Sequence, residues 1–185
     1  VTGKEWGWQE CPASRVLLVD NELHRDTLSC RLHRVATAMG ISDDDEHLDG
    51  LTILSQRGAA TNIRQLKMQL ETHSDLKFDV IIIDALYKAL PKDVDENSNG
   101  QITDIYNLLD SYARTMGGAI VLVHHTSQGN QANKSITDVG SGAGAQSRSP
   151  DTHLTFRQHH VDGVVSVIGC VRILPLSRPL CRRRD

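Results

Sequence analysis

Short apolar runs alternate along the chain with stretches whose apolar residues recur at helical spacing. Four runs have the length and composition of strands buried on both faces, and they are residues 15–20, 51–54, 79–84 and 119–124. Three stretches carry an apolar stripe typical of an amphipathic helix, and they are residues 28–39, 63–70 and 102–116. This alternation predicts a mostly parallel sheet with helices on both faces.

The remainder of the chain follows a different pattern. Residues 126–150 are rich in Gly, Ser, Asn and Gln without periodicity, and a loop of this length is usually functional or disordered. Residues 152–157 and 164–171 resemble two strands separated by a turn, which predicts an antiparallel hairpin at the sheet edge. The predicted fold class is therefore a three-layer α/β core with a C-terminal antiparallel β-hairpin.

Composition narrows the possible functions. The chain has 20 Lys and Arg against 23 Asp and Glu, a net charge of −3, which excludes a strongly basic nucleic-acid-binding protein. No apolar run reaches the ~20 residues of a membrane span. Residues 1–8 lack the features of a secretory signal. Four scattered cysteines, without a CxxC pair, are typical of free thiols in the cytoplasm, which is the expected location.

Polar side chains follow three of the predicted strands. In a parallel sheet the ligand lies beyond the carboxyl ends of the strands, where this chain has Asp20, Glu22, Asp84, His124 and His125. Carboxylates there are costly unless they are paired, solvated or bound to a cation. Mg²⁺ favours one or two carboxylates together with substrate phosphates, and a second carboxylate can polarise a water. The set suits phosphoryl transfer to water.

Each of these residues also has a simpler explanation. Asp20 is expected to cap the helix that follows it, and Glu22 is also explained as an acid in the first turn of that helix. His124 is expected to be packed in the core. His125 faces the opposite way along the strand and is the better polar candidate. Asp84, after four apolar β-branched residues, is the least easily explained by structure alone.

Three segments together resemble a known family. Residues 16–22 (VLLVDNE), 79–88 (DVIIIDALYK) and 119–129 (AIVLVHHTSQG), with Arg31, resemble the RecA-like ATPase core of the RepA hexameric helicase type. The resemblance extends over residues 3–172 and covers most of the chain. It implies ATP and Mg²⁺ as cofactors, single-stranded DNA as a partner, and a homo-oligomeric ring, a hexamer in this family.

The resemblance also implies roles for individual residues. Asp84 matches the acid that holds Mg²⁺, and Glu22 matches the glutamate that activates the attacking water. His125 matches the histidine that contacts the γ-phosphate, and Arg31 matches an arginine near the nucleotide. The mobile loop that faces DNA corresponds roughly to residues 127–146. The candidate DNA contacts are Lys134 within this loop and Arg148 just after it, of which Lys134 is the stronger candidate for a phosphate.

The chain departs from this family in two places. The phosphate-binding motif GxxxxGK[ST] is absent, since Gly3 and Lys4 are followed by Glu5. The arginine that the family places before a Gly-Ser segment is also absent from residues 139–142, and Arg148 is only a displaced candidate. We therefore expect a fragment, inactive alone, with a remnant at residues 1–14, the ATPase core at 15–172 and an irregular tail at 173–185.

Three alternatives stay open. The chain is also explained as a non-catalytic RecA-like module that binds DNA or assembles a ring. Residues 16–22 also resemble the acidic strand of a receiver domain, with Asp84 as phospho-acceptor, although no Lys-Pro pair follows Thr126. A metallohydrolase is the weakest alternative, because adjacent histidines on a strand face opposite ways and do not easily share one metal.

Overall fold

The computed structural model describes residues 1–5, 10–42, 44–59, 61–72, 77–125, 144–155 and 170–173. A six-stranded sheet has the order β2-β1-β3-β4-β6-β5. Its strands are β1 (Val16–Asp20), β2 (Leu51–Ser55), β3 (Val80–Asp84), β4 (Ala119–His124), β5 (Thr152–Thr155) and β6 (Cys170–Ile173). The first four in sequence are parallel, whereas β6 runs antiparallel to β4 and to β5. The predicted α/β class is confirmed.

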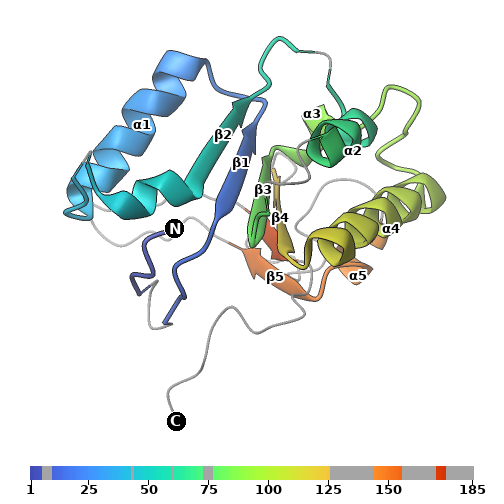
Figure 1. Ribbon diagram of the computed structural model, residues 1–185. Helices are drawn as coiled ribbons and strands as arrows, with labels where there is room; N and C mark the ends of the chain where they lie inside the picture. The colour runs from blue at the N-terminus through green and yellow to red at the C-terminus, as the bar shows by residue number, and fades with distance from the viewer. Residues whose placement is uncertain are drawn as a thin grey trace, which may run out of the picture.

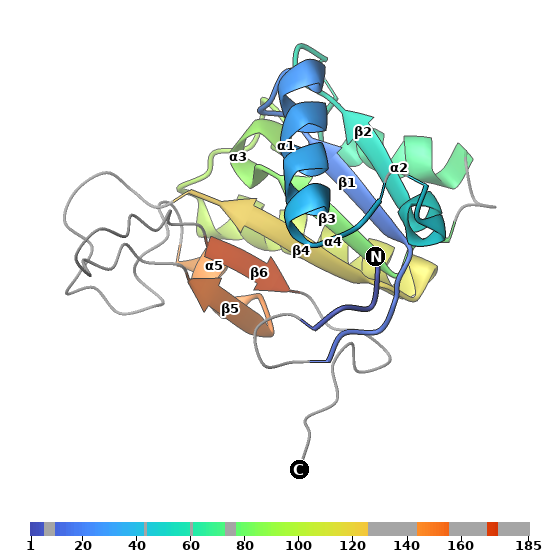
Figure 2. The same ribbon diagram turned by 90° about the vertical axis from the view of Figure 1, so that its left-hand side faces the viewer.

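Helices cover both faces of this sheet. They are α1 (Arg25–Ala38), α2 (Ile63–Thr72), α3 (Leu86–Ala89), α4 (Asn99–Met116) and α5 (Ala145–Arg148), and a 3-10 turn, η1, spans Glu46–Gly50. Figures 1 and 2 show α1 on one face and α2 and α4 on the opposite face, which gives three layers. Across the described residues, none of these helices combines the length and apolar character that crossing a membrane requires.

The main core lies between α4 and the central strands. α4 buries six side chains against the sheet, and they are Ile102, Ile105, Tyr106, Leu109, Tyr112 and Ala113. The strands contribute Ile81 and Ile83 from β3 and Ile120 and Leu122 from β4. Burial of each large apolar side chain contributes about 1.5–3 kcal/mol, so this layer holds β3 and β4 firmly in place.

Two glycines, Gly117 and Gly118, join the end of α4 to the start of β4. Gly117 adopts φ +66°, the left-handed conformation that glycine reaches without steric cost, and terminates the helix. Gly118 lies very close to the backbone just before β3, because a Cβ at this position would lie 2.6 Å from the carbonyl oxygen of Phe78. The tight turn lets β4 begin directly beside β3.

The predicted antiparallel pair at the C-terminal end is described only in part. β5 lies within the first predicted strand, 152–157, and β6 at Cys170–Ile173 overlaps the end of the second, 164–171, of which residues 164–169 lie outside the described residues. The position of β6 is decided by pairing with β4, where His124 lies opposite Cys170. The expected loop at 126–150 contains the short helix α5 at its end, and residues 126–143 lie outside the described part. The division at residues 14 and 172 stays a prediction.

Candidate active site

Three strands end side by side and bring their polar residues together. In the parallel register Asp20 lies opposite Asp84, and Asp84 lies opposite Val123, two positions before His125. Ligand atoms of Glu22, Asp84 and His125 all lie within 4.8 Å of one another. The structure thus gathers three of the sequence-predicted site residues at one point on the carboxyl edge of the sheet.

Asp20 shapes the turn that carries Glu22. Its side chain is almost fully buried, and Oδ1 accepts hydrogen bonds from the backbone amides of Glu22 (3.1 Å) and Leu23 (2.8 Å). The expectation that Asp20 caps the following helix is wrong, because α1 begins later, after His24 in the capping position. Asp20 instead closes a tight turn at the strand end, as aspartates commonly do.

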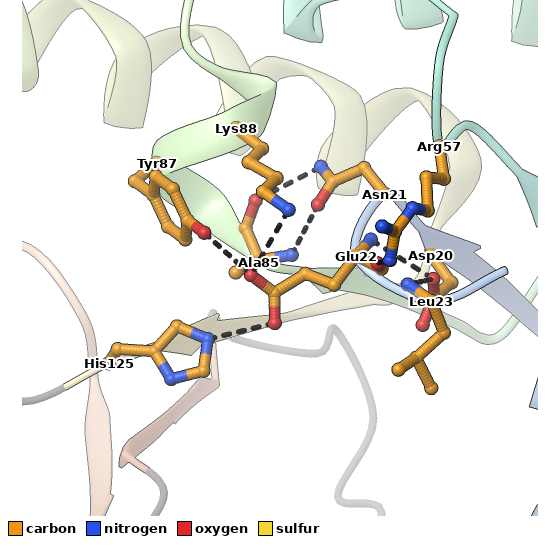
Figure 3. A network of polar contacts seen from close by, with 9 residues as sticks. All are labelled: Asp20, Asn21, Glu22, Leu23, Arg57, Ala85, Tyr87, Lys88 and His125. Atoms are coloured by element: carbon orange, nitrogen blue, oxygen red, sulfur yellow. Dashed lines mark hydrogen bonds and ion pairs between the residues drawn. The ribbon is translucent and has the colours of Figure 1, made fainter.

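Asn21 ties this turn to the chain beyond Asp84. Its side-chain Oδ1 accepts from the backbone amide of Ala85 at 2.7 Å, and its Nδ2 donates to the Ala85 carbonyl oxygen at 3.1 Å. The Asn21 amide also donates to the Asp84 carbonyl oxygen at 2.8 Å. Figure 3 shows the Asn21 side chain bonded to the Ala85 backbone beside Glu22. Because Asn21 and Ala85 are both buried, these bonds fix the spacing between the carboxylates of Glu22 and Asp84.

Glu22 is the centre of a polar network. Its Oε1 accepts a 2.7 Å hydrogen bond from the Tyr87 hydroxyl and lies 3.6 Å from Nζ of Lys88. Its Oε2 lies 3.0 Å from Nε2 of His125. Figure 3 shows these three side chains converging on the Glu22 carboxylate. Arg57 also donates to the Glu22 backbone carbonyl.

The same network sets the acidity of Glu22. Partial burial raises the pKa of Glu22, but hydrogen bonds from Tyr87 and His125 and the charges of His125 and Lys88 outweigh burial. The net effect is a lowered pKa, which keeps Glu22 ionised near neutral pH. An ionised carboxylate next to an open strand end is able to accept a proton from water.

Asp84 has the opposite electrostatic environment. Its pKa is raised, first by burial and then by the negative charges of Asp20 and Glu22, which His125 and Lys88 only partly offset. Carboxylates held close together in this way repel one another unless a cation lies between them. This oxygen-rich, negatively charged donor set fits a hard divalent cation such as Mg²⁺.

The two histidines that end β4 face opposite ways. His124 is 3% exposed and belongs to the interior, whereas the side chain of His125 is 53% exposed and reaches Glu22. This arrangement follows from the alternation of side chains along a strand. It agrees with the prediction that His125, and not its neighbour, is the polar candidate.

Among the described residues, the cluster of Glu22, Asp84 and His125 does not include Arg31 or Arg148. Arg31 is exposed on α1, and within the described residues no ion pair joins it to Glu22 or Asp84. Arg148 is exposed in α5, which is held to the start of α4 by a 2.8 Å hydrogen bond from the Ala145 amide to Asn99 Oδ1. Lys134 and the predicted DNA-facing loop, apart from its last three residues, lie outside the described part of the chain.

Sequence reasoning missed the roles of Asn21 and Tyr87. Asn21 stands between two acids at the end of β1, and an amide between two carboxylates was a usable signal. Tyr87 follows Asp84 by three positions, and its contact with Glu22 depends on the chain turning into α3 immediately after β3. That turn carries no strong sequence signal, because α3 is only four residues long.

Comparison with known proteins places the chain beside one family. A family model described as an AAA domain matches residues 1–131, a range that includes β1 to β4 with Glu22, Asp84 and His125. No curated protein matches the chain. The match covers well over half of the 185 residues.

Proposed function

The chain belongs to the AAA domain family, and from that premise we propose that it forms the water-activating part of an ATP-hydrolysing motor of the RepA helicase type. Nucleotide binding is the general property of AAA-type domains. The observation that carries the proposal is the meeting of Glu22, Asp84 and His125 at the carboxyl edge of the parallel sheet. Their chemistry is that required for transfer of a phosphoryl group to water.

Each residue has a role in this proposal. Asp84 holds Mg²⁺, which when bound neutralises the charge of the nucleotide phosphates. Glu22 orients the attacking water and takes its proton onto a carboxylate oxygen. His125 donates a hydrogen bond to the γ-phosphate and reports its loss to the loop that follows β4. Arg31 supplies positive charge near the nucleotide.

The finer assignment includes partners and assembly. We propose that single-stranded DNA binds the loop at residues 127–146, with Lys134 and Arg148 as cationic contacts. Subunits arranged in a homo-oligomeric ring, a hexamer, would place the nucleotide between neighbours. The support is the resemblance of residues 16–22, 79–88 and 119–129 to RepA-type helicases.

The lack of a phosphate-binding motif among these 185 residues limits what the isolated chain does. The 185 residues contain no GxxxxGK[ST] motif, which supplies backbone amides and a lysine to the phosphates. We therefore expect negligible ATP turnover from the isolated chain. Clear steady-state turnover by the isolated chain that Asp84→Ala abolishes would contradict this expectation.

The decisive experiment measures nucleotide binding and ATP turnover by the full-length product of the gene that encodes this chain. Glu22→Gln is expected to retain nucleotide binding and to lower turnover about 100-fold or more, because a proton acceptor is lost. Glu46→Gln, an exposed substitution of the same chemistry in η1, is the matched control and should retain full turnover. Unchanged turnover in Glu22→Gln would remove Glu22 from the proposed role.

The missing motif also favours a second candidate, a non-catalytic module that binds DNA or assembles a ring. Single-stranded DNA binding, ATP turnover and the reading frame upstream of Val1 separate the two functions. An open reading frame that starts at Val1, and single-stranded DNA binding without turnover, would support the module. A GxxxxGK[ST] motif encoded within a few tens of residues upstream would support the enzyme.

A further inference from the structure

Tyr87 is an exposed aromatic residue that makes a hydrogen bond and ring contacts with described residues of the candidate site. Its side chain is on the surface of α3, and 43% of the residue is exposed. The hydroxyl nevertheless donates to Glu22 Oε1 at 2.7 Å, and the ring meets the His125 ring edge-on at 5.9 Å between centroids. Nζ of Lys88 lies 5.7 Å from the ring centroid. An exposed tyrosine is readily solvated by water, so this arrangement points to a task beyond packing.

The two oxygens of Glu22 have partners on different elements. Oε1 faces Tyr87 and Lys88 on α3, whereas Oε2 faces His125 beyond the end of β4. The α3 side is held by core packing, because the flanking residues Leu86 and Ala89 are 1% and 5% exposed and belong to the main core. The His125 side is the more open one, with an exposed imidazole.

We propose that Tyr87 is a positioning residue that anchors Glu22 through Oε1 and leaves Oε2 as the oxygen that turns from His125 to the attacking water. The anchor holds the carboxylate in place while its second oxygen changes partner. The Tyr87 hydroxyl is suited to this task, since its hydrogen bond to Glu22, burial and nearby negative charge raise the pKa of Tyr87 to about 12. It therefore stays a neutral donor at any physiological pH.

This inference deepens the proposed function and rests on it for its kinetic consequence. The anchoring itself is a property of the chain without nucleotide, which allows the two to be tested separately. The geometry makes Lys88 a weaker partner, at 3.6 Å from Oε1 and without a hydrogen bond. Removal of the Tyr87 hydroxyl alone should therefore release Oε1 of Glu22 and leave its carboxylate held only at Oε2 by His125.

The first measurement is made on the isolated chain with Tyr87→Phe. This variant keeps the ring, its contact with His125 and its exposed position, so the fold is retained. Side-chain three-bond couplings by NMR are expected to show one Glu22 rotamer in the original chain and an average over several in the variant. Tyr112→Phe is the matched control, because it removes a tyrosine hydrogen bond to the Ile63 carbonyl oxygen, away from the site.

The second measurement is ATP turnover by the full-length product of the gene that encodes this chain. Tyr87→Phe is expected to lower kcat about tenfold, the effect of losing a hydrogen bond to a charged group, while KM for ATP changes less than about twofold. Tyr112→Phe should leave both constants near their original values. A change in KM alone would indicate a role in nucleotide binding and would overturn the positioning role.

The outcomes distinguish this inference from the proposed function. Unaltered Glu22 couplings in Tyr87→Phe would overturn the anchoring, whatever the turnover. Loss of turnover in Glu22→Gln, combined with full turnover and unaltered couplings in Tyr87→Phe, would leave the proposed function intact and remove Tyr87. Full turnover in Glu22→Gln would overturn the proposed function, while averaged couplings in Tyr87→Phe would still support the anchor.

Discussion

α4 and α1 both carry an apolar stripe in the sequence, but the stripe of α1 is weaker and the two helices pack very differently. α4 buries six side chains, whereas α1 buries only Leu28 and leaves Val35 56% exposed. Beneath α4 lie the central strands β3 and β4, while α1 lies over β1 and the edge strand β2 (Figure 2). A groove of about 920 Å³ separates α1 from β2. The looser packing of α1 goes with its weaker apolar stripe and with its place over an edge strand.

The candidate site contains one carboxylate from the closely packed region under α4 and one from the loosely packed region next to α1. Asp84 ends β3, whose Ile81 and Ile83 are in the main core, so packing fixes its position. Glu22 lies in the connection from β1 to the loosely packed α1, and side-chain hydrogen bonds hold it in place. Core packing positions one half of the site, and polar contacts position the other half.

The largest expected effect tests the contrast between the two helices directly. Leu109→Ala in α4 should lower the free energy of unfolding by about 3 kcal/mol, because a fully buried leucine leaves a cavity. Val35→Ala in α1 should change it by less than about 0.5 kcal/mol. Urea unfolding of both variants provides the measurement. Equal losses would show that α1 is packed as closely as α4.

A smaller loss in the free energy of unfolding is expected at Asn21, whose hydrogen bonds join the end of β1 to the chain after β3. Asn21→Leu leaves the buried amide and carbonyl of Ala85 without their side-chain partner, which should cost about 2 kcal/mol. Asn107→Leu, on the exposed face of α4, is the matched control and should cost less than about 0.5 kcal/mol. The readout is again urea unfolding. A neutral Asn21→Leu would mean that packing alone fixes the connection.

The smallest effects, about 1 kcal/mol or less, concern the pH dependence of the two carboxylates. Asp84 has a raised pKa, so its contribution to stability is present below the ordinary value of 3.8 and is lost as pH rises through the raised pKa. Asp84→Asn should therefore stabilise the chain at pH 7, and the gain should disappear toward pH 3.8. Thermal unfolding over this pH range provides the test.

Substitution of Glu22 should change the stability at pH 7 in the opposite direction to substitution of Asp84. Its pKa is lowered, so its contribution is present above the ordinary value of 4.5 and is lost as pH falls through the lowered pKa. Glu22→Gln should destabilise the chain at pH 7, and the loss should shrink at lower pH. The same sign for both variants in thermal unfolding would contradict the electrostatic contrast between the two sides.

Much of the fold and part of the site were predictable from the sequence. The buried strands at residues 79–84 and 119–124 and the end of α4 at Gly117 carry local signals, and the structure confirms them. The two histidines that end β4 face opposite ways because side chains alternate along a strand. The capping role of Asp20 was wrong, because the start of α1 depends on a turn that local propensity does not fix.

The sequence by itself determined which chemical groups follow each strand, because apolar runs and the acids or histidines behind them are local features. Only the tertiary structure decided which of these groups meet. Glu22 and His125 are 103 positions apart in the sequence. They touch because β1, β3 and β4 are successive parallel strands of the sheet, so the residues that follow β1 and β4 meet at the same edge. Strand order, and the Asn21 and Tyr87 contacts that depend on it, arise from packing between distant segments, which a pattern of neighbouring residues does not encode.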